Sequence, residues 1–241
     1  MERTPVILEQ DLVPYSTSPL PPGPWIILAP HPDDETIGMG GTIAMGARAG
    51  KLIHVVFITD GGIGGAPEVR RQEARKALTI LGVRSYKFLD LPDRRVHNLT
   101  EVLAKKIIAE MEKIKPYTVF APSIMEFHPD HRATTQALLK ALLKKVPEHA
   151  VWLYEISRQS EVNALVNISS VIEIKKEAIS CYYSQLAQND YLDTALSLNR
   201  LRAYTLSPQG IRWCEGFWTG KACTIVKALK ERLLLYTKLD C

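Results

Sequence analysis

Short apolar runs alternate with longer amphipathic segments along the first two thirds of the chain, and this alternation constrains the fold more than any other feature. The runs are WIILAP (25–30), LIHVVFIT (52–59), YKFLDL (86–91), TVFAPS (118–123) and AVWLYEI (150–156). Segments of helical periodicity lie between them, among them 67–82, 99–115 and 131–145. Continuously apolar strands separated by helices are typical of a parallel sheet that is covered on both faces. The sequence therefore predicts an α/β fold, with a three-layer, Rossmann-like, mostly parallel sheet.

The two ends of the chain do not follow this alternation. Residues 1–24 are rich in proline and include the run Pro21-Pro22-Gly23-Pro24, which opposes both helix and central strand because proline fixes φ and lacks an N–H. After Ile156 we expect a further strand in NALVNIS (163–169) and helices over about 171–185, 189–203 and 222–238. The chain of 241 residues is thus predicted to form an N-terminal arm (1–24) and a single α/β domain (25–241).

Charge and composition narrow the choice of partner and compartment. The net charge of +4 is too mild to indicate nucleic acid as a partner, and it is compatible with anionic substrates. No stretch approaches the roughly 18 apolar residues of a membrane span, and no basic start leads into an apolar run. Four cysteines without a C-x-x-C pair predict neither a zinc knuckle nor a disulfide framework. We expect a cytoplasmic protein that acts on a small molecule, without nucleic acid or a membrane span, and as a monomer or a homo-oligomer.

Two clusters of ionisable residues directly follow two of the predicted strands. Pro30-His31-Pro32-Asp33-Asp34-Glu35 follows the first strand, and His128-Pro129-Asp130-His131 follows the fourth. Parallel strands deliver their loops to the same carboxyl edge, where open α/β sheets bind ligands. Carboxylates crowded at such an edge repel one another unless a cation compensates them. The two clusters therefore predict a divalent metal site.

The residue types suggest how such a site would work. Imidazole nitrogen and carboxylate oxygen suit zinc or another divalent transition metal. One Zn²⁺ per chain, bound by His31, Asp34 and His131, would keep the open position at which catalytic zinc activates a water. Asp33 would then be free to act as general base toward that water. His128, in its protonated form, would stabilise an oxyanion, and Asp130 would hold its tautomer and favour its charge.

Structural explanations compete with these assignments. An isolated His-Pro-Asp-Asp is more often a turn whose aspartates cap a helix, but capping leaves Glu35 and the second cluster unexplained. The glycines at 38, 40 and 41 lack the third glycine of a dinucleotide fingerprint, because Ile43 stands there, so close packing of helix on strand explains them better. The glycine-rich segment 61–65 lacks a following G-K-[ST] and is more typical of a mobile loop, here a candidate substrate lid, than of a phosphate cradle.

The pair PHPDDE and HPDH resembles the PIG-L/LmbE-like zinc-dependent de-N-acetylases, a family of N-acetylglucosaminyl deacetylases. Two weaker similarities, Thr59-Asp60-Gly61 and Arg70-Arg71-Gln72-Glu73, extend the resemblance over most of residues 25–185. The resemblance implies the following roles: zinc ligands His31, Asp34 and His131, general base Asp33, oxyanion stabiliser His128 with Asp130 behind it, and substrate contact by Arg70.

The resemblance also implies a reaction. It indicates a hydrolase that removes the N-acetyl group from an N-acetylglucosamine-type sugar or glycoconjugate, with a water on the metal as nucleophile. The residues alone support amide or ester hydrolysis. Two alternatives stay open: an amidase of the same family that acts on larger conjugates, and a non-catalytic sugar- or nucleotide-binding module. A binding module has no use for a free carboxylate such as Asp33 beside the metal.

Overall fold

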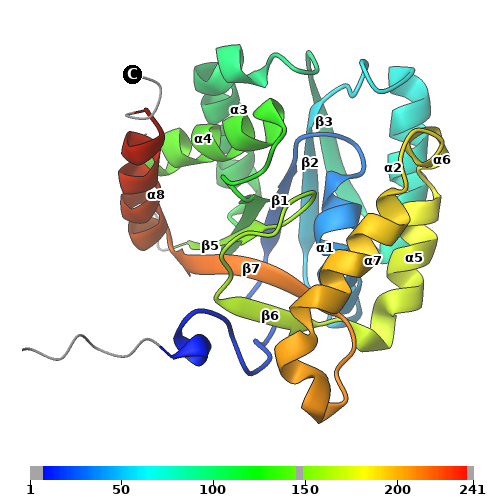
Figure 1. The fold of residues 1–241 in the computed structure, drawn as a ribbon. Coiled ribbons are helices and arrows are strands. Elements are labelled where there is room, and N and C mark those ends of the chain that lie inside the picture. The colour runs from blue at the N-terminus through cyan, green and yellow to red at the C-terminus, as the bar shows by residue number, and fades with distance from the viewer. Residues whose placement is uncertain (1–7, 145–148, 238–241) are drawn as a thin grey trace, which may run out of the picture.

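A seven-stranded sheet forms the centre of the computed structural model, which describes residues 8–144 and 149–237 (Figure 1). The strands are β1 (Trp25–Ala29), β2 (Ile53–Thr59), β3 (Ser85–Leu91), β4 (Thr118–Pro122), β5 (Ala150–Tyr154), β6 (Ala164–Asn167) and β7 (Cys214–Lys221). Their order in the sheet is β3-β2-β1-β4-β5-β7-β6. The neighbours among β1–β5 pair in parallel, whereas β7 is antiparallel to both β5 and β6. The predicted α/β class with a mostly parallel sheet is confirmed.

Helices cover both faces of the sheet (Figure 1). On one side lie α1 (Asp34–Arg48), α2 (Pro67–Leu81), α5 (Ile172–Ser180), α6 (Tyr183–Leu186) and α7 (Tyr191–Arg202). On the other lie α3 (Thr100–Ile114), α4 (Pro129–Lys144) and α8 (Ala222–Thr237). Short 3-10 helices are η1 (Glu9–Asp11), η2 (Val96–Leu99), η3 (Ser169–Val171) and η4 (Tyr204–Gln209). Successive side chains of a strand point to opposite faces, so Ile27 of β1 enters one apolar core and Ile26 the other.

The topology creates a crevice at the carboxyl edge between β1 and β4. These strands are neighbours, with Trp25 opposite Thr118, yet β1 leads to β2 on one side and β4 leads to β5 on the other. Such a switch point leaves room for a ligand because the two loops diverge from it. Both sequence clusters follow these two strands, so the fold brings them to this crevice.

Two elements differ from the sequence prediction. The predicted helix over 171–185 is divided into α5 and α6, which lets the Tyr182 hydroxyl donate to Glu35 at 2.7 Å. The strand β7, with the sequence CEGFWTGK, was not predicted because its glycines interrupt the apolar pattern. A Cβ at Gly216 would lie 2.8 Å from a carboxylate oxygen of Glu155 and 3.1 Å from Arg202, so a buried ion pair explains this glycine.

Helix α1, which begins at Asp34 in the first histidine-aspartate cluster, is interrupted at Met39, whose φ of −144° is not helical. Beyond the interruption, the free N–H groups of Gly41 and Thr42 donate to the carboxylate of Glu215 on β7. A Cβ at Gly41 would lie 2.6 Å from Ile168, so the helix packs closely on its neighbours, as expected for these glycines.

The described part of the arm is hydrogen-bonded to the domain, and residues 14–18 contact its C-terminal half. The Ser18 N–H donates to the Leu165 carbonyl, and the Thr205 hydroxyl donates to the Pro14 carbonyl. Separation of the arm from the domain stays a prediction. No helix within residues 8–144 and 149–237 has the length and apolar character needed to cross a membrane.

The cysteines within these ranges are free thiols that differ in exposure. Cys214 is buried, Cys181 is half-buried and Cys223 is exposed. Cys241 lies outside the described residues.

Candidate metal centre and active site

The loop that follows β1 turns sharply at Asp33, whose φ of 149° is one that only glycine adopts without strain. Asp33 stands at the N-cap position of α1, yet its side chain makes no capping hydrogen bond. Its carboxylate instead accepts a hydrogen bond from Arg70 Nη2 at 3.0 Å. Helix capping therefore does not explain Asp33.

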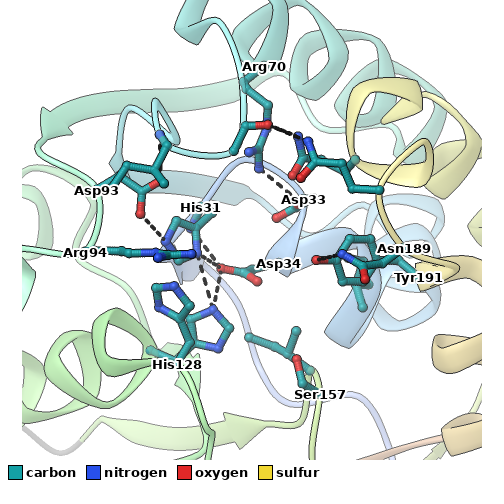
Figure 2. Close-up of a pocket in the computed structure, with 17 residues that line it drawn as sticks. His31, Asp33, Asp34, Arg70, Asp93, Arg94, His128, Ser157, Asn189 and Tyr191 are labelled. Atoms are coloured by element: carbon teal, nitrogen blue, oxygen red, sulfur yellow. Dashed lines mark hydrogen bonds and ion pairs between the residues drawn. The ribbon is translucent and has the colours of Figure 1, made fainter.

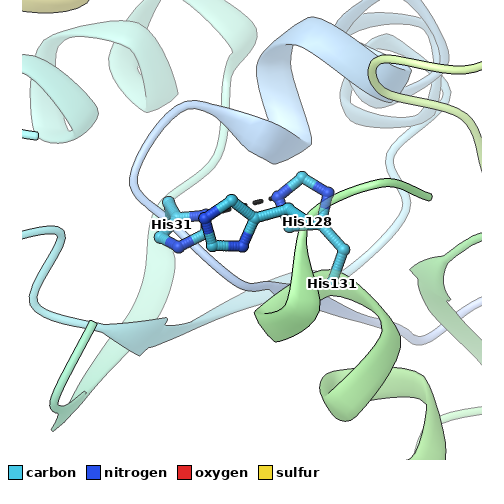
Figure 3. A group of neighbouring side chains, drawn as sticks. All are labelled: His31, His128 and His131. Carbon is cyan, nitrogen blue, oxygen red and sulfur yellow. Dashed lines mark hydrogen bonds between the residues drawn. The ribbon is translucent and has the colours of Figure 1, made fainter. Parts of the chain in front are cut away.

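Three side chains from the two clusters meet at one point (Figures 2 and 3). His31 Nδ1 lies 3.1 Å from Asp34 Oδ2, His131 Nε2 lies 3.2 Å from the same oxygen, and the two nitrogens are 3.3 Å apart. A tetrahedral ion with ligand bonds of about 2.0–2.1 Å separates its ligand atoms by about 3.3 Å. The spacing and the N₂O donor set both fit zinc.

The pKa values of these side chains indicate that the carboxylates of the cluster require a compensating positive charge. Burial would lower the pKa of His131, but the carboxylates of Asp34 and Glu126 raise it to about 9. Burial would raise the pKa of Asp34, but His131 and His31 hold it well below its usual value. Without a cation, the imidazoles must carry protons to balance the carboxylates. A metal ion bound here would supply that charge and displace those protons.

The outer nitrogens of the two imidazoles face further carboxylates. His31 Nε2 lies 3.2 Å from Asp93 and 3.5 Å from Asp130, and His131 Nδ1 lies 3.6 Å from Glu126. Neither nitrogen has a hydrogen bond of good geometry among the described residues. Carboxylates behind metal-binding histidines orient the rings and set which nitrogen binds the ion. Asp93, Asp130 and Glu126 are placed for this role.

Two other groupings of ligand atoms are close enough to hold an ion. One is formed by His31, His128 and His131 (Figure 3), and the other by His31, Asp93 and Asp130. In the second grouping the Asp130 carboxylate is already engaged, because it accepts hydrogen bonds from the backbone N–H groups of Arg94 and Val96 at 2.6 and 3.1 Å. In the predicted set with Asp34, the three ligand atoms lie 3.1, 3.2 and 3.3 Å from one another.

His128 lies beside His31 and His131, but its contact with Asp130 differs from the predicted one. The Asp130 carboxylate faces His31 and not His128, and only the backbone N–H of Asp130 reaches His128 Nδ1, at 3.2 Å. Burial and the neighbouring His31 and His131 lower the pKa of His128 to about 4. The ring is therefore neutral near pH 7, with its proton on Nε2, and can donate one hydrogen bond in that form.

Arg70 contacts the predicted general base. Its guanidinium is 3% exposed and donates to Asp33, to the Pro32 carbonyl at 2.8 Å and to the Gly61 carbonyl at 3.4 Å. Burial raises the pKa of Asp33 to about 7, and Arg70 acts in the opposite direction. A carboxyl that titrates near neutral pH suits a general base.

These groups line a cavity of about 260 Å³ at the carboxyl edge (Figure 2). Ile63 and Gly64, from the loop after β2, form part of its rim. The Gly64 carbonyl accepts from Gln185 and Gln188 at 2.9 and 2.8 Å, which fixes the loop against the segment around α6. The candidate lid is therefore at the pocket, as the sequence suggested.

Asp93, Glu126 and Tyr191 also belong to the site, and sequence reasoning did not assign them. Asp93 ends the run Leu91-Pro92-Asp93 directly after β3, so the rule that identified the other clusters would also have found it. Glu126 accepts from the backbone N–H groups of Ile156 and Ser157, a contact with no signal in the local sequence. Tyr191 comes from α7, far along the chain.

The amino-acid sequence is similar to those of known deacetylases. The family described as "PIG-L: GlcNAc-PI de-N-acetylase" matches residues 26–142. Diacetylchitobiose deacetylase of Thermococcus kodakarensis is 28% identical over 216 residues, which cover 79% of this chain and 80% of the relative. A probable N-acetyl-alpha-D-glucosaminyl L-malate deacetylase of Bacillus cereus is 27% identical and covers 81% of this chain and 97% of the relative.

The fold agrees with this relationship. The solved structure of N,N'-diacetylchitobiose deacetylase from Pyrococcus horikoshii superposes with a TM-score of 0.65 and 26% identity, over 83% of this chain and 84% of that chain. The prediction of a deacetylase, a hydrolase of amide bonds, is confirmed by these relatives. Residues 26–142, which run from β1 into α4 and include both histidine-aspartate clusters, thus match the family of PIG-L de-N-acetylases.

Proposed function

We propose that the protein is a zinc-dependent N-deacetylase of N-acetylglucosamine-type sugars or glycoconjugates. The observation that carries the proposal is the convergence of three mutually close ligand atoms with a separate buried carboxylate, Asp33, whose pKa of about 7 lets it exchange protons. The relatives named for removing acetyl groups from N-acetylglucosamine compounds support the substrate class.

His31, Asp34 and His131 would hold the ion. When bound, zinc supplies a Lewis acid that lowers the pKa of a water from 15.7 to about 7. The strained turn at Asp33 holds its carboxylate beside Asp34 but turned toward Arg70, which keeps it available as a proton acceptor.

In the reaction, Asp33 accepts a proton from the attacking water as the water oxygen bonds to the acetamide carbon. His128 donates from Nε2 to the developing oxyanion, which is a role for the neutral ring that the structure favours. The proton on Asp33 then passes to the departing nitrogen as the C–N bond breaks. One amide and one water thus give acetate and a primary amine.

The test combines metal content with product release. Purified protein is analysed for bound metals and assayed for acetate release from N-acetylglucosamine and diacetylchitobiose, before and after removal of metal by a chelator. We expect about one zinc per chain and an activity that is lost on chelation and restored by zinc. Zinc binding without acetate release from any N-acetylated sugar would contradict the deacetylase proposal. Full activity in metal-free protein would contradict the role of zinc.

A further inference from the structure

Every charged side chain that lines the pocket, except Arg94, lies beside a group of opposite charge. Apart from the histidines, the charged side chains that line the cavity are Asp33, Asp34, Asp93, Arg70 and Arg94. The three carboxylates each face an arginine or an imidazole, and Arg70 is bound to Asp33. The Arg94 guanidinium has no ion pair or hydrogen bond with the described residues of the chain. The pocket thus presents one guanidinium that has no ion-pair partner among the described residues.

The backbone of Arg94 is hydrogen-bonded close to the cluster formed by His31, Asp34 and His131. Its N–H donates to the Asp130 carboxylate at 2.6 Å, and that carboxylate lies 3.5 Å from His31 Nε2. Its φ of 59° lies in the left-handed region that favours glycine. Strained residues persist where the surrounding structure fixes them, and they concentrate at functional sites. Here a long cationic side chain stands where glycine would fit more easily.

The side chain of Arg94 points into the cavity, and the opposite side of the cavity has a different chemistry (Figure 2). Ser157, Asn189 and Tyr191 lie there, and all are uncharged groups that exchange hydrogen bonds with hydroxyls. A sugar ring with its hydroxyls toward these residues would leave its remaining substituent on the side of Arg94. The pocket therefore has a neutral polar half and a cationic half.

We propose that Arg94 forms a subsite for an anionic group, a carboxylate or a phosphate, in the aglycone of the substrate. The inference rests on the proposed deacetylase function and specifies its substrate class. In an N-acetylglucosamine conjugate the aglycone is attached at C1, next to the C2 that carries the acetamide. An anion linked at C1 therefore lies within a few bonds of the amide that reacts at the metal cluster, close to Arg94. A guanidinium binds either anion through two parallel hydrogen bonds.

The experiment compares matched substrates. Acetate release is measured from methyl N-acetyl-α-glucosaminide, which is neutral, from N-acetyl-α-glucosamine 1-phosphate and from the malate glycoside of N-acetyl-α-glucosamine. A charge-assisted contact predicts a kcat/KM about 10- to 100-fold higher for a charged probe than for the neutral one. Phosphate and malate probes show which anion is favoured. The ratio should decrease as salt is added.

Variants assign the preference to Arg94. In Arg94→Gln the ratio of charged to neutral kcat/KM should fall to near one. Arg94→Gly should lower the ratio equally while its thermal midpoint stays the same or rises, because glycine relieves the strained φ. The matched control is Arg95→Gln, an exposed neighbour that does not line the cavity, and it should keep the wild-type ratio.

The outcomes separate the two proposals. Acetate release from the neutral probe with a ratio near one in the wild type would overturn the anionic subsite and leave the deacetylase proposal standing. A high ratio that survives in Arg94→Gln would also overturn the role of Arg94. Failure of the zinc-loaded protein to release acetate from any of the three probes would count against the proposed function itself.

Discussion

The guanidinium of Arg70 lies 3.0 Å from the carboxylate of Asp33, and both groups are almost entirely buried. Because Arg70 is also bound to two backbone carbonyls, it fixes the position of Asp33 as well as its charge. The family resemblance implied a contact between Arg70 and the substrate, and the geometry adds a direct contact with Asp33, the proposed general base.

The two roles of Arg70 predict different kinetics. In Arg70→Gln, a positioning role lowers kcat by about 10²-fold with little change in KM, because the carboxylate loses its orienting partner. A substrate contact alone would raise KM and leave kcat near its wild-type value. Steady-state kinetics on N-acetylglucosamine distinguish the two roles. Arg71→Gln, which alters the half-buried neighbour that pairs with Asp90, is the control.

Replacement of the general base should separate catalysis from metal binding. Asp33→Asn should keep zinc, since Asp33 does not belong to the close group of ligand atoms, and lower kcat by about 10²–10⁴-fold. The control is Asp90→Asn, which makes the same change at another residue with positive φ on the surface. Near-normal turnover in Asp33→Asn would show that another group takes the proton.

Unlike Asp33, the proposed metal ligands should be needed for zinc binding as well as for activity. His31→Ala or His131→Ala should lose zinc and activity together, because each removes one of the three close donors. Asp130→Asn, which changes a group behind His31, should weaken zinc binding by about 10- to 100-fold. Zinc titration with a competing chelator measures both effects, and His97→Ala, at an exposed histidine, should match the wild type. Normal zinc affinity in His131→Ala would refute the proposed ligand set.

His128 should contribute to the transition state alone. His128→Ala should bind zinc normally and lower kcat by about 10²–10³-fold, as expected for loss of an oxyanion donor. His128→Gln retains an N–H donor and should recover part of the rate. A loss of zinc in His128→Ala would instead favour the grouping of three histidines as the metal site.

The buried pair Lys175–Glu215 predicts a stability effect away from the pocket. Both side chains are fully buried, and Glu215 also accepts from Gly41 and Thr42 at 2.8 and 2.7 Å. Glu215→Ala should therefore destabilise the fold by about 3–5 kcal/mol, because the buried Lys175 ammonium keeps its hydrogen bond to Asn199 but loses its counter-charge. Urea unfolding measures this change. The double variant Lys175→Met with Glu215→Gln should lose less, and an equal or larger loss would argue against charge as the cause.

The sequence predicted the convergence of the two clusters because it depends only on strand order and on the shared carboxyl edge of parallel strands. His31, Asp34 and His131 are accordingly found together. Contacts made across the fold carry no such pattern. The pairing of Arg70 with Asp33 spans 37 residues and depends on how α2 packs.

Local sequence was misleading at Asp130. Its position two residues after His128 suggested a contact between the side chains, but α4 begins at Pro129 and turns the carboxylate toward the N–H groups of Arg94 and Val96. Strand β7 was missed for a related reason. Gly216 is required there because a Cβ would clash with the distant Glu155, and this contact is not visible in the local sequence.

The antiparallel strand β7 also determines whether the chemistry can be separated from the rest of the chain. A fragment limited to residues 26–142 would contain every proposed zinc ligand and Asp33, yet it would leave one edge of β4 without its partner β5. Exposed strand edges promote aggregation. The fragment would also lack Glu215, the acceptor for the interrupted helix that begins at Asp34. The residues proposed to carry the reaction therefore depend on the later strands of the sheet, and we expect an active truncated enzyme to extend at least through Lys221.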